Sequence, residues 1–231
     1  MRIGLYTDTH YSSFDIGGSA RRRTLAPERV RAAYDSFIAR GCDMALCLGD
    51  LTDGDVSAEK ERENLVFLAS VIDSYPIPTV VLMGNHDAFD FTPDEFYSLI
   101  GEDKRPHDIS DGGRKLIFID ACWFRDGRHY MPGDSDWTDT FYPYAGDIPR
   151  LLGDCREAYI FMHQNIDPDL PQNHRLYNAD RMISVIRDDG RVKKVFQGHY
   201  HPGHVSEHDG IGYVTLPALC EHEGAYMITD I

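Results

Sequence analysis

Five short polar motifs each come directly after a short apolar segment, and this placement constrains the fold more than any other feature. The apolar segments are short enough to be buried strands, and the stretches between several of them have helical periodicity. The motifs are Asp8-Thr9-His10, Gly49-Asp50, Gly84-Asn85-His86-Asp87, His163 and Gly198-His199-Tyr200-His201. In open α/β sheets, ligands gather outside the carboxyl ends of the strands. Residues far apart in the sequence are therefore predicted to meet in one cleft.

The expected elements alternate in the first half of the chain, and the second half contains more strands. The predicted strands cover residues 2–7, 44–48, 79–83, 115–121, 158–162, 194–197, 205–208, 211–216 and 225–231. The predicted helices cover residues 27–40, 57–74 and 93–100, and Asn178 is expected to cap a fourth. Asp209-Gly210 is typical of a hairpin turn. This order predicts an α/β sandwich with mixed sheets.

The length of 231 residues suits one large domain, which we expect to span residues 1–231. No stretch approaches the ~18 consecutive apolar residues of a membrane span, so no membrane association is expected. The first seven residues read as a core strand directly before Asp8, which argues against a cleavable signal peptide. Five scattered cysteines without a CxxC pair favour a reduced, cytoplasmic setting.

The formal net charge of −15 bears on the choice of partner. Two bound divalent cations would cancel only ~4 units of this charge. A field this negative opposes binding along a nucleic-acid backbone, so a nuclease is disfavoured. A small phosphorylated or nucleotide substrate stays compatible, because bound metal ions dominate the local potential. The sequence leaves the oligomeric state open.

The side chains in the five motifs share one chemistry. Carboxylate, imidazole and amide oxygen are ligands for manganese, iron or zinc. No cysteine belongs to the motifs, which argues against a structural zinc site. Seven candidate ligands suit two ions that share a bridging carboxylate, for which Asp50 is the natural choice. They are Asp8, His10, Asp50, Asn85, His163, His199 and His201. Each motif alone could be a turn, a loop cap or an ordinary histidine, but the five together predict a dinuclear metal centre.

From Asp8 to His201, the motif pattern resembles the calcineurin-like metallophosphoesterase superfamily. The resemblance implies a four-layer α-β-β-α sandwich with two mixed β-sheets and a dimetal site at the strand C-terminal edge. It implies that the first ion is held by Asp8, His10, Asp50 and His201, and the second by Asp50, Asn85, His163 and His199. We expect two divalent ions, manganese or iron, with zinc as an alternative.

This centre predicts a phosphoesterase. Two divalent ions ~3.5–4 Å apart can share a water and lower its pKa to near neutrality, so that a metal-bridging hydroxide attacks phosphorus. His86 is adjacent to a ligand without being one, and we expect it to protonate the leaving oxygen. Asp87 either orients His86 by a hydrogen bond or caps a loop.

Substrate-binding candidates are fewer. The run Arg21-Arg22-Arg23 precedes a helix, where the macrodipole disfavours cations, so it is either a solvated run or a phosphate clamp. Arg22 and Arg23 are the candidates from this run, and Tyr200 is a third. The segment 123–149 lacks periodicity, and its aromatic residues either stack on a nucleobase or pack the loop. These residues are Tyr130, Trp137, Phe141, Tyr142 and Tyr144.

A narrower resemblance concerns the reaction. The arginine run, Leu48-Gly49-Asp50 and residues 216–221 look like manganese-dependent ADP-ribose/CDP-alcohol diphosphatases. That subgroup commonly has Gln where this chain has His10, and the complete Asp-x-His motif is more typical of cyclic-nucleotide and glycerophosphodiester phosphodiesterases. The expected function is therefore hydrolysis of a small phosphodiester or nucleotide diphosphate.

Alternatives are a cyclic-nucleotide or glycerophosphodiester phosphodiesterase and, from another class, a non-catalytic metal-binding scaffold on the same fold. Six further histidines are expected at the surface, without a role in the centre. They are His107, His129, His174, His204, His208 and His222.

Overall fold

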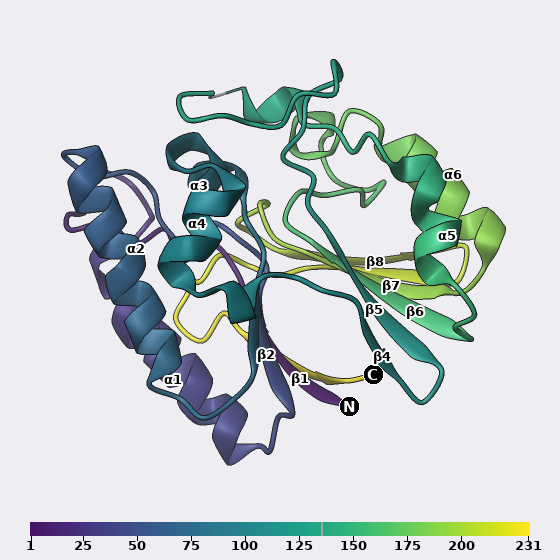
Figure 1. Ribbon diagram of the computed structural model, residues 1–231, viewed down its shortest axis with the longest axis horizontal. Coiled ribbons are helices and arrows are strands. Elements are labelled where there is room, and N and C mark those ends of the chain that lie inside the picture. Colours follow the sequence, from purple (N-terminus) through teal and green to yellow (C-terminus); the bar gives the residue numbers. More distant parts are fainter. Residues whose placement is uncertain (135) are drawn as a thin grey trace.

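The computed structural model describes residues 1–134 and 136–231, which form two β-sheets packed face to face (Figure 1). The first sheet has the order β10-β1-β2-β3 and the second the order β4-β5-β6-β7-β9-β8. The strands are β1 Arg2–Tyr6, β2 Met44–Cys47, β3 Thr79–Val81, β4 Ile109–Asp111, β5 Arg114–Ile119, β6 Glu157–Met162, β7 Val192–Gln197, β8 His204–His208, β9 Ile211–Thr215 and β10 Met227–Asp230. Both sheets are mixed, because β10, β4 and β8 run antiparallel to their neighbours.

Helices cover the outer face of each sheet. α1 Ala26–Ala39, α2 Ala58–Asp73, α3 Asn85–Asp90 and α4 Pro93–Ile100 lie on the side of the first sheet, and α5 Ile148–Leu152 and α6 Ala179–Asp189 lie on the second (Figure 1). Short 3-10 turns cover Arg23–Leu25, Glu102–Lys104, Trp137–Asp139, Ala145–Asp147 and Gln172–His174. The expected four-layer α-β-β-α sandwich is confirmed.

The cores follow from the alternation of side chains along each strand. In β1, Ile3 and Leu5 point between the sheets and meet Phe161 and Phe196 from the second sheet. Tyr6 points the other way, into a cluster with helices α1 and α2. Burial on both faces explains why these strands are apolar runs rather than alternating patterns.

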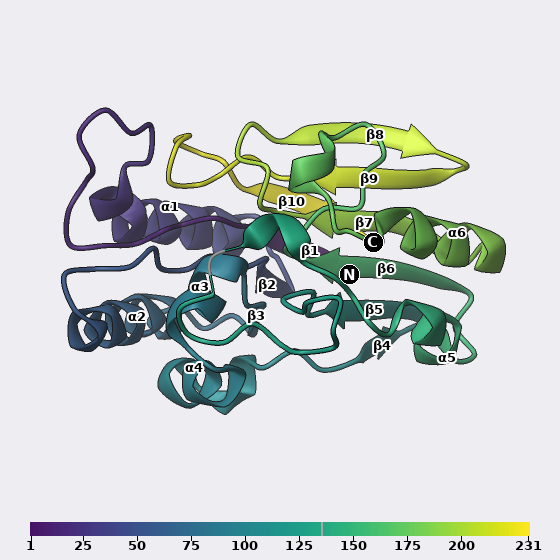
Figure 2. The same cartoon turned by 90° about the horizontal axis from the view of Figure 1, so that it is seen from above.

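The parallel strands direct their carboxyl ends toward one edge, and this edge receives the polar motifs. Backbone pairing continues beyond β1 and β2, since the amide of Asp8 donates to Gly49 O at 3.0 Å and that of His10 to Asp50 O at 3.0 Å. The loop that follows β5 crosses above this edge (Figures 1 and 2). The fold thus gathers segments from both halves of the chain.

Two local expectations need correction. Asn178 precedes α6, but its side chain makes no cap hydrogen bond; it bonds instead to the backbone of Tyr142, at 3.1 Å to the amide and 2.8 Å to the carbonyl. No helix was expected directly after β3, but α3 begins there, at Asn85 itself.

No helix among the described residues is both long enough and apolar enough to cross a membrane.

Candidate metal centre and active site

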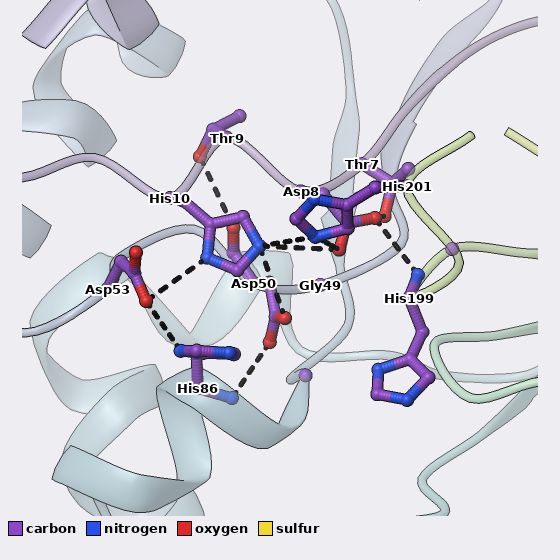
Figure 3. Close-up of polar contacts among 12 residues, drawn as sticks. Thr7, Asp8, Thr9, His10, Gly49, Asp50, Asp53, His86, His199 and His201 are labelled. Atoms are coloured by element: carbon purple, nitrogen blue, oxygen red, sulfur yellow. Dashed lines mark hydrogen bonds and ion pairs between the residues drawn. The ribbon is translucent and has the colours of Figure 1, made fainter. Parts of the chain in front are cut away.

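The candidate ligands sit on strained backbone. Positive φ angles occur at Asp8 (52°), His10 (45°), Asp50 (55°) and His199 (67°). Such values are uncommon for residues other than glycine and collect at functional sites. Each of these residues follows the end of a strand, where the chain turns sharply and directs the side chain into the space above the sheets (Figure 3).

Asp8 is fully buried and is held by donors on one oxygen only. Its Oδ2 accepts from Thr7 Oγ1 at 2.6 Å and from the backbone amide of His199 at 3.0 Å. Its Oδ1 has no hydrogen-bond partner among the described residues, and lies 3.5 Å from Nε2 of both His10 and His201. One oxygen is therefore fixed while the other is left to bind a cation.

Asp50 lies between the two halves of the centre. Its Oδ1 accepts from the backbone amide of His86 at 2.9 Å (Figure 3). Its Oδ2 lies 3.2 Å from His163 Nε2 and 3.5 Å from His10 Nε2. Asp50 belongs to one potential ligand group with His163 and His199, and to another with His10 and His86. This shared membership is what a bridging carboxylate requires.

His163 and His201 present their Nε2 atoms to the centre because their Nδ1 atoms are engaged. His163 Nδ1 lies 2.9 Å from Leu48 O, and His201 Nδ1 lies 2.6 Å from Glu221 Oε1. Such partners fix ring orientation and tautomer in metal sites. His10 Nε2 and His201 Nε2 are only 3.1 Å apart, about the spacing of two ligands on one ion bound at ~2.1 Å.

These residues fit a pair of divalent ions. Asp8 Oδ1, Asn85 Oδ1 and His163 Nε2 are buried atoms without a hydrogen-bond partner in the described structure. Buried polar atoms are normally satisfied, so several orphans that converge on one space indicate a bound group. Oxygen and imidazole donors suit manganese, iron or zinc.

Without ions, the charges in the centre compete with one another. Burial lowers the pKa of His163, but the Asp50 carboxylate outweighs it and raises that pKa to about 9. Burial and the neighbouring His163 lower the pKa of His199 to about 3. Although burial opposes it, the His163 charge holds the pKa of Asp50 below its ordinary value. A cation held at Asp50 would supply the positive charge that the His163 imidazolium supplies in its absence.

His86 stands beside the centre and is oriented by Asp53. His86 Nδ1 lies 2.6 Å from Asp53 Oδ1, and His10 Nδ1 lies 3.4 Å from the same oxygen (Figure 3). For Asp87, two alternatives were open, orienting His86 or capping a loop. Asp87 accepts from the backbone amides of Gly84 (3.0 Å), Leu51 (2.9 Å) and Thr52 (3.2 Å), which is the loop-capping alternative.

The arginine run divides into three environments. Arg21 Nη1 binds both carboxylate oxygens of Asp53, at 3.0 and 2.8 Å, and lines the cavity above the candidate ligands. Arg23 is buried, with Nη1 on Asp53 O at 3.0 Å and its guanidinium 4.6 Å above the Phe14 ring. Arg22 is exposed and does not line that cavity. Of the three arginines, Arg21 lines this cavity, whereas Arg22 and Arg23, the predicted pair, do not.

A cavity of about 340 Å³ opens above the centre. Its walls include Tyr200, as predicted, together with His174, which was expected at the surface. Trp137 lines this cavity and an adjoining one of about 280 Å³, with its ring 5.2 Å from that of His199. Among the described residues, these features form an aromatic wall beside the polar floor.

The other aromatic residues of the segment 123–149 pack the loop. Tyr130 and Tyr142 are buried, and Phe141 pairs with Trp123 through a β-bridge. Tyr144 is 47% exposed and meets the Trp123 ring edge-on. The packing alternative thus holds for Phe141, Tyr142 and Tyr144. Tyr130 is buried but also lines the second cavity, together with Trp137.

Three residues near the centre were missed by sequence reasoning: Asp53, Glu221 and Cys220. Cys220 is buried, and its Sγ falls within 4.8 Å of ligand atoms on His10 and His201. Burial raises the pKa of its thiol well above the ordinary value. Asp53 follows Asp50 by three residues, a signal that was available in the sequence.

Comparison with known proteins agrees with this geometry. The model of the calcineurin-like phosphoesterase family matches residues 1–216, and the chain belongs to this family. The family consists of metal-dependent phosphoric ester hydrolases with a dinuclear metal centre, and this chain brings candidate ligand groups together at the corresponding edge.

Two proteins and one solved structure are similar to this chain over most of its length. A protein named "Probable cyclic nucleotide phosphodiesterase" from Pseudoalteromonas sp. (strain SM9913) is 26% identical over 228 residues, which cover 94% of this chain and 78% of the relative. A protein of the same name from Psychrobacter arcticus is 23% identical over 233 residues, covering 93% and 78%. The crystal structure of a dimetal phosphatase from Danio rerio superposes with a TM-score of 0.81 at 16% identity, covering 98% of this chain and 91% of that one.

Proposed function

We propose that this protein hydrolyses a phosphodiester or diphosphate bond in a small nucleotide-type substrate. The observation that carries the proposal is the convergence of metal-type donors on one space. Asp50 groups with His163 and His199 and also with His10, while Asp8 lies 3.5 Å from His10 and His201. This space is the floor of a cavity that His86, Arg21 and Trp137 also line. Binding scaffolds on this fold would have no need of a complete donor set together with an oriented histidine.

In this proposal, Asp8, His10, Asp50 and His201 would hold one ion. Asp50, Asn85, His163 and His199 would hold the other. Manganese or iron is proposed, with zinc as the alternative, and the pair would supply a nucleophile from water and positive charge for the phosphoryl oxygens. The geometry around Asp50 supports the shared ligand.

His86 is proposed to protonate the leaving oxygen. Because its Nδ1 faces Asp53, the other ring nitrogen is the atom that can exchange a proton with substrate. His86 lines both cavities, so a leaving group in either one is within its reach. A general acid at this position contributes ~10²–10⁴-fold to the rate.

Arg21 and Trp137 are the proposed substrate contacts. Arg21 donates to Asp53 through Nη1 only, so its other donors are left to bind a phosphate. Trp137 offers an aromatic ring at the junction of the two cavities, where a nucleobase would stack. Tyr200 lines the same wall.

Two substrate classes follow from different observations. The relatives' names favour a cyclic nucleotide. The combination of Arg21 with two adjoining cavities favours a nucleotide diphosphate, since each cavity would take one side of the scissile bond. The net charge of −15 disfavours long nucleic acids in both cases.

The test is a substrate panel with the Mn²⁺-loaded protein: bis-p-nitrophenyl phosphate, cyclic AMP, a glycerophosphodiester, ADP-ribose, CDP-glycerol and p-nitrophenyl phosphate. We expect turnover of the diester and of at least one nucleotide, and a ~10²–10⁴-fold loss in His86→Ala. Absence of turnover with manganese, iron or zinc, in protein shown to be folded, would leave the scaffold alternative.

The cellular setting is also a proposal. A reducing cytoplasmic environment is supported by the five cysteines, all within the described residues, each of which is unpaired.

A further inference from the structure

A second cluster of metal-type side chains lies on the edge strand β8, away from the dinuclear centre. His204, Ser206 and His208 alternate along β8 and therefore share one face of the sheet. That face is partly covered, whereas the opposite face is exposed, with Val205 at 69%. The covering segment follows β6 and brings Asp167 and Asp169 against the two histidines.

The contacts in this cluster leave several donor atoms unused. Asp167 is fully buried, and its Oδ1 accepts from Ser206 Oγ at 2.8 Å and from the amide of Asp169 at 3.0 Å. Its Oδ2 has no hydrogen-bond partner among the described residues, and the same holds for the buried Nε2 atoms of His204 and His208.

The unused atoms converge. Ligand atoms of Asp167, Asp169 and His208 all lie within 4.8 Å of one another. Asp169 Oδ2 is 3.1 Å from His208 Nε2 and 3.8 Å from His204 Nε2. These spacings are close to the ~3.3 Å between neighbouring ligands of a tetrahedral ion bound at ~2.0 Å. Asp167, Asp169 and His208 already form this group, and His204, 3.8 Å from Asp169, is the candidate for a fourth ligand.

We propose that Asp167, Asp169, His204 and His208 bind a single divalent transition metal, and that zinc is the ion that fits. Two imidazoles and two carboxylates form a tetrahedral donor set for Zn²⁺, whereas Mg²⁺ and Ca²⁺ prefer oxygen alone. An uncompensated carboxylate oxygen in a buried position is costly, and a cation removes that cost. None of the four residues belongs to the seven ligands of the dinuclear centre.

An ion pair between His208 and Asp169, without a metal, explains fewer of these contacts than a bound ion does. It accounts for Asp169 and His208, which are partly exposed, but it gives no partner to Asp167 Oδ2. A bound ion serves both carboxylates at once. It also fastens the segment after β6, which carries His163 and His174, to the edge of the second sheet.

The test measures the number of zinc ions bound per chain. Full-length protein is stripped with chelator, equilibrated with Zn²⁺, freed of excess metal, and analysed by elemental mass spectrometry. We expect His208→Ala and Asp169→Asn each to hold one zinc per chain fewer than wild type. Both side chains are partly exposed, so circular dichroism should show unchanged folding. His107→Ala, which removes an exposed histidine elsewhere, should keep the wild-type content.

Equal zinc content in wild type and His208→Ala would overturn the proposal, as would an equal loss in His107→Ala. Because the result is a difference between variants, it does not depend on whether the dinuclear centre is occupied or active. Diffraction at the zinc absorption edge offers a second readout, in which the anomalous peak should lie between Asp167 and His208.

Discussion

Asp53 connects three functional side chains, since it contacts His10, His86 and Arg21. Its pKa is held well below the ordinary value because the two histidines outweigh the effect of burial, so it is a fixed negative charge. Asp53→Asn keeps the shape and removes the charge. We expect kcat to fall ~10–100-fold at saturating metal, as for other partners of ligands. An unchanged kcat would show that His86 needs no orientation.

Arg21 and Arg22 provide a matched pair. Arg21→Ala removes the guanidinium that lines the cavity, and we expect at least a ~10-fold rise in KM for a nucleotide substrate, because charge-assisted hydrogen bonds to phosphate are lost. Arg22→Ala, at an exposed neighbour, should leave KM within about twofold. Steady-state kinetics of both variants test this prediction. An equal rise in KM for Arg21→Ala and Arg22→Ala would contradict a specific phosphate contact by Arg21.

At the residue scale, the sequence predicted that the motifs would lie together, because each follows a strand end that hydrophobicity reveals. It failed where a partner comes from elsewhere. Glu221 reaches His201 only through the fold. Asp53 contacts His86, but adjacency in the sequence pointed only to Asp87 as a possible partner of that histidine. His174 was missed because nothing local distinguishes a histidine in a loop from one in a cavity wall.

At the scale of elements, the turn from β3 into α3 depends on Gly84, because this residue has no Cβ. A Cβ on Gly84 would lie 2.0 Å from Asp50 Oδ1 and 2.6 Å from Asp50 N. Its φ of −102° is accessible to any residue, so the obstacle is space alone. We expect Gly84→Ala to displace Asp50 and to lower metal content and turnover by at least ~10-fold.

Gly17→Ala is the control, because nothing lies within 4 Å of a Cβ there. Metal analysis and the diesterase assay on both variants test the claim. Wild-type metal content in Gly84→Ala would mean that the turn has more room than the structure allows.

Elements differed in how far they could be predicted. The long amphipathic helices α1 and α2 lie within two residues of expectation, because periodicity over four turns is a strong signal. α3 and β4 have only six and three residues, too few for any period to show. Trp137 and Tyr142 lie in the same aperiodic segment. Trp137 faces the cavities and Tyr142 is buried in the core, and this difference arises only from tertiary packing.

For the molecule as a whole, Glu61 should make stability depend on pH. Burial raises its pKa to about 7, while Oε1 accepts from the amide of Gly54 at 3.0 Å. An acid with a raised folded-state pKa binds its proton more tightly when folded. The free energy of unfolding therefore falls as pH rises from about 4.5 to 7, by an amount on the order of 1–3 kcal/mol.

Glu61→Gln keeps the acceptor and removes the titration. We expect the variant to match wild type near pH 4.5 and to exceed it in urea-denaturation stability at pH 8. A constant difference between the two proteins across this range would show that the carboxyl does not titrate as described.

The global arrangement was only partly legible in the sequence. Alternating strands and helices predicted a sandwich with mixed sheets, and the resemblance supplied its four layers. The pattern did not reveal that β10, at the end of the chain, pairs with β1, with Arg2 opposite Asp230. Long-range pairing of this kind is decided by packing of the whole chain rather than by local preference.

The central claim is that hydrolysis depends on two ions held around Asp50. The most direct measurement is a Mn²⁺ titration of chelator-stripped protein, following bis-p-nitrophenyl phosphate hydrolysis and bound metal together, in wild type and Asp50→Ala. We predict no turnover without metal, full turnover when two ions are bound per chain, and loss of both binding and turnover in Asp50→Ala. Turnover that persists after metal removal, or an Asp50→Ala protein that binds both ions and remains active, would contradict the account.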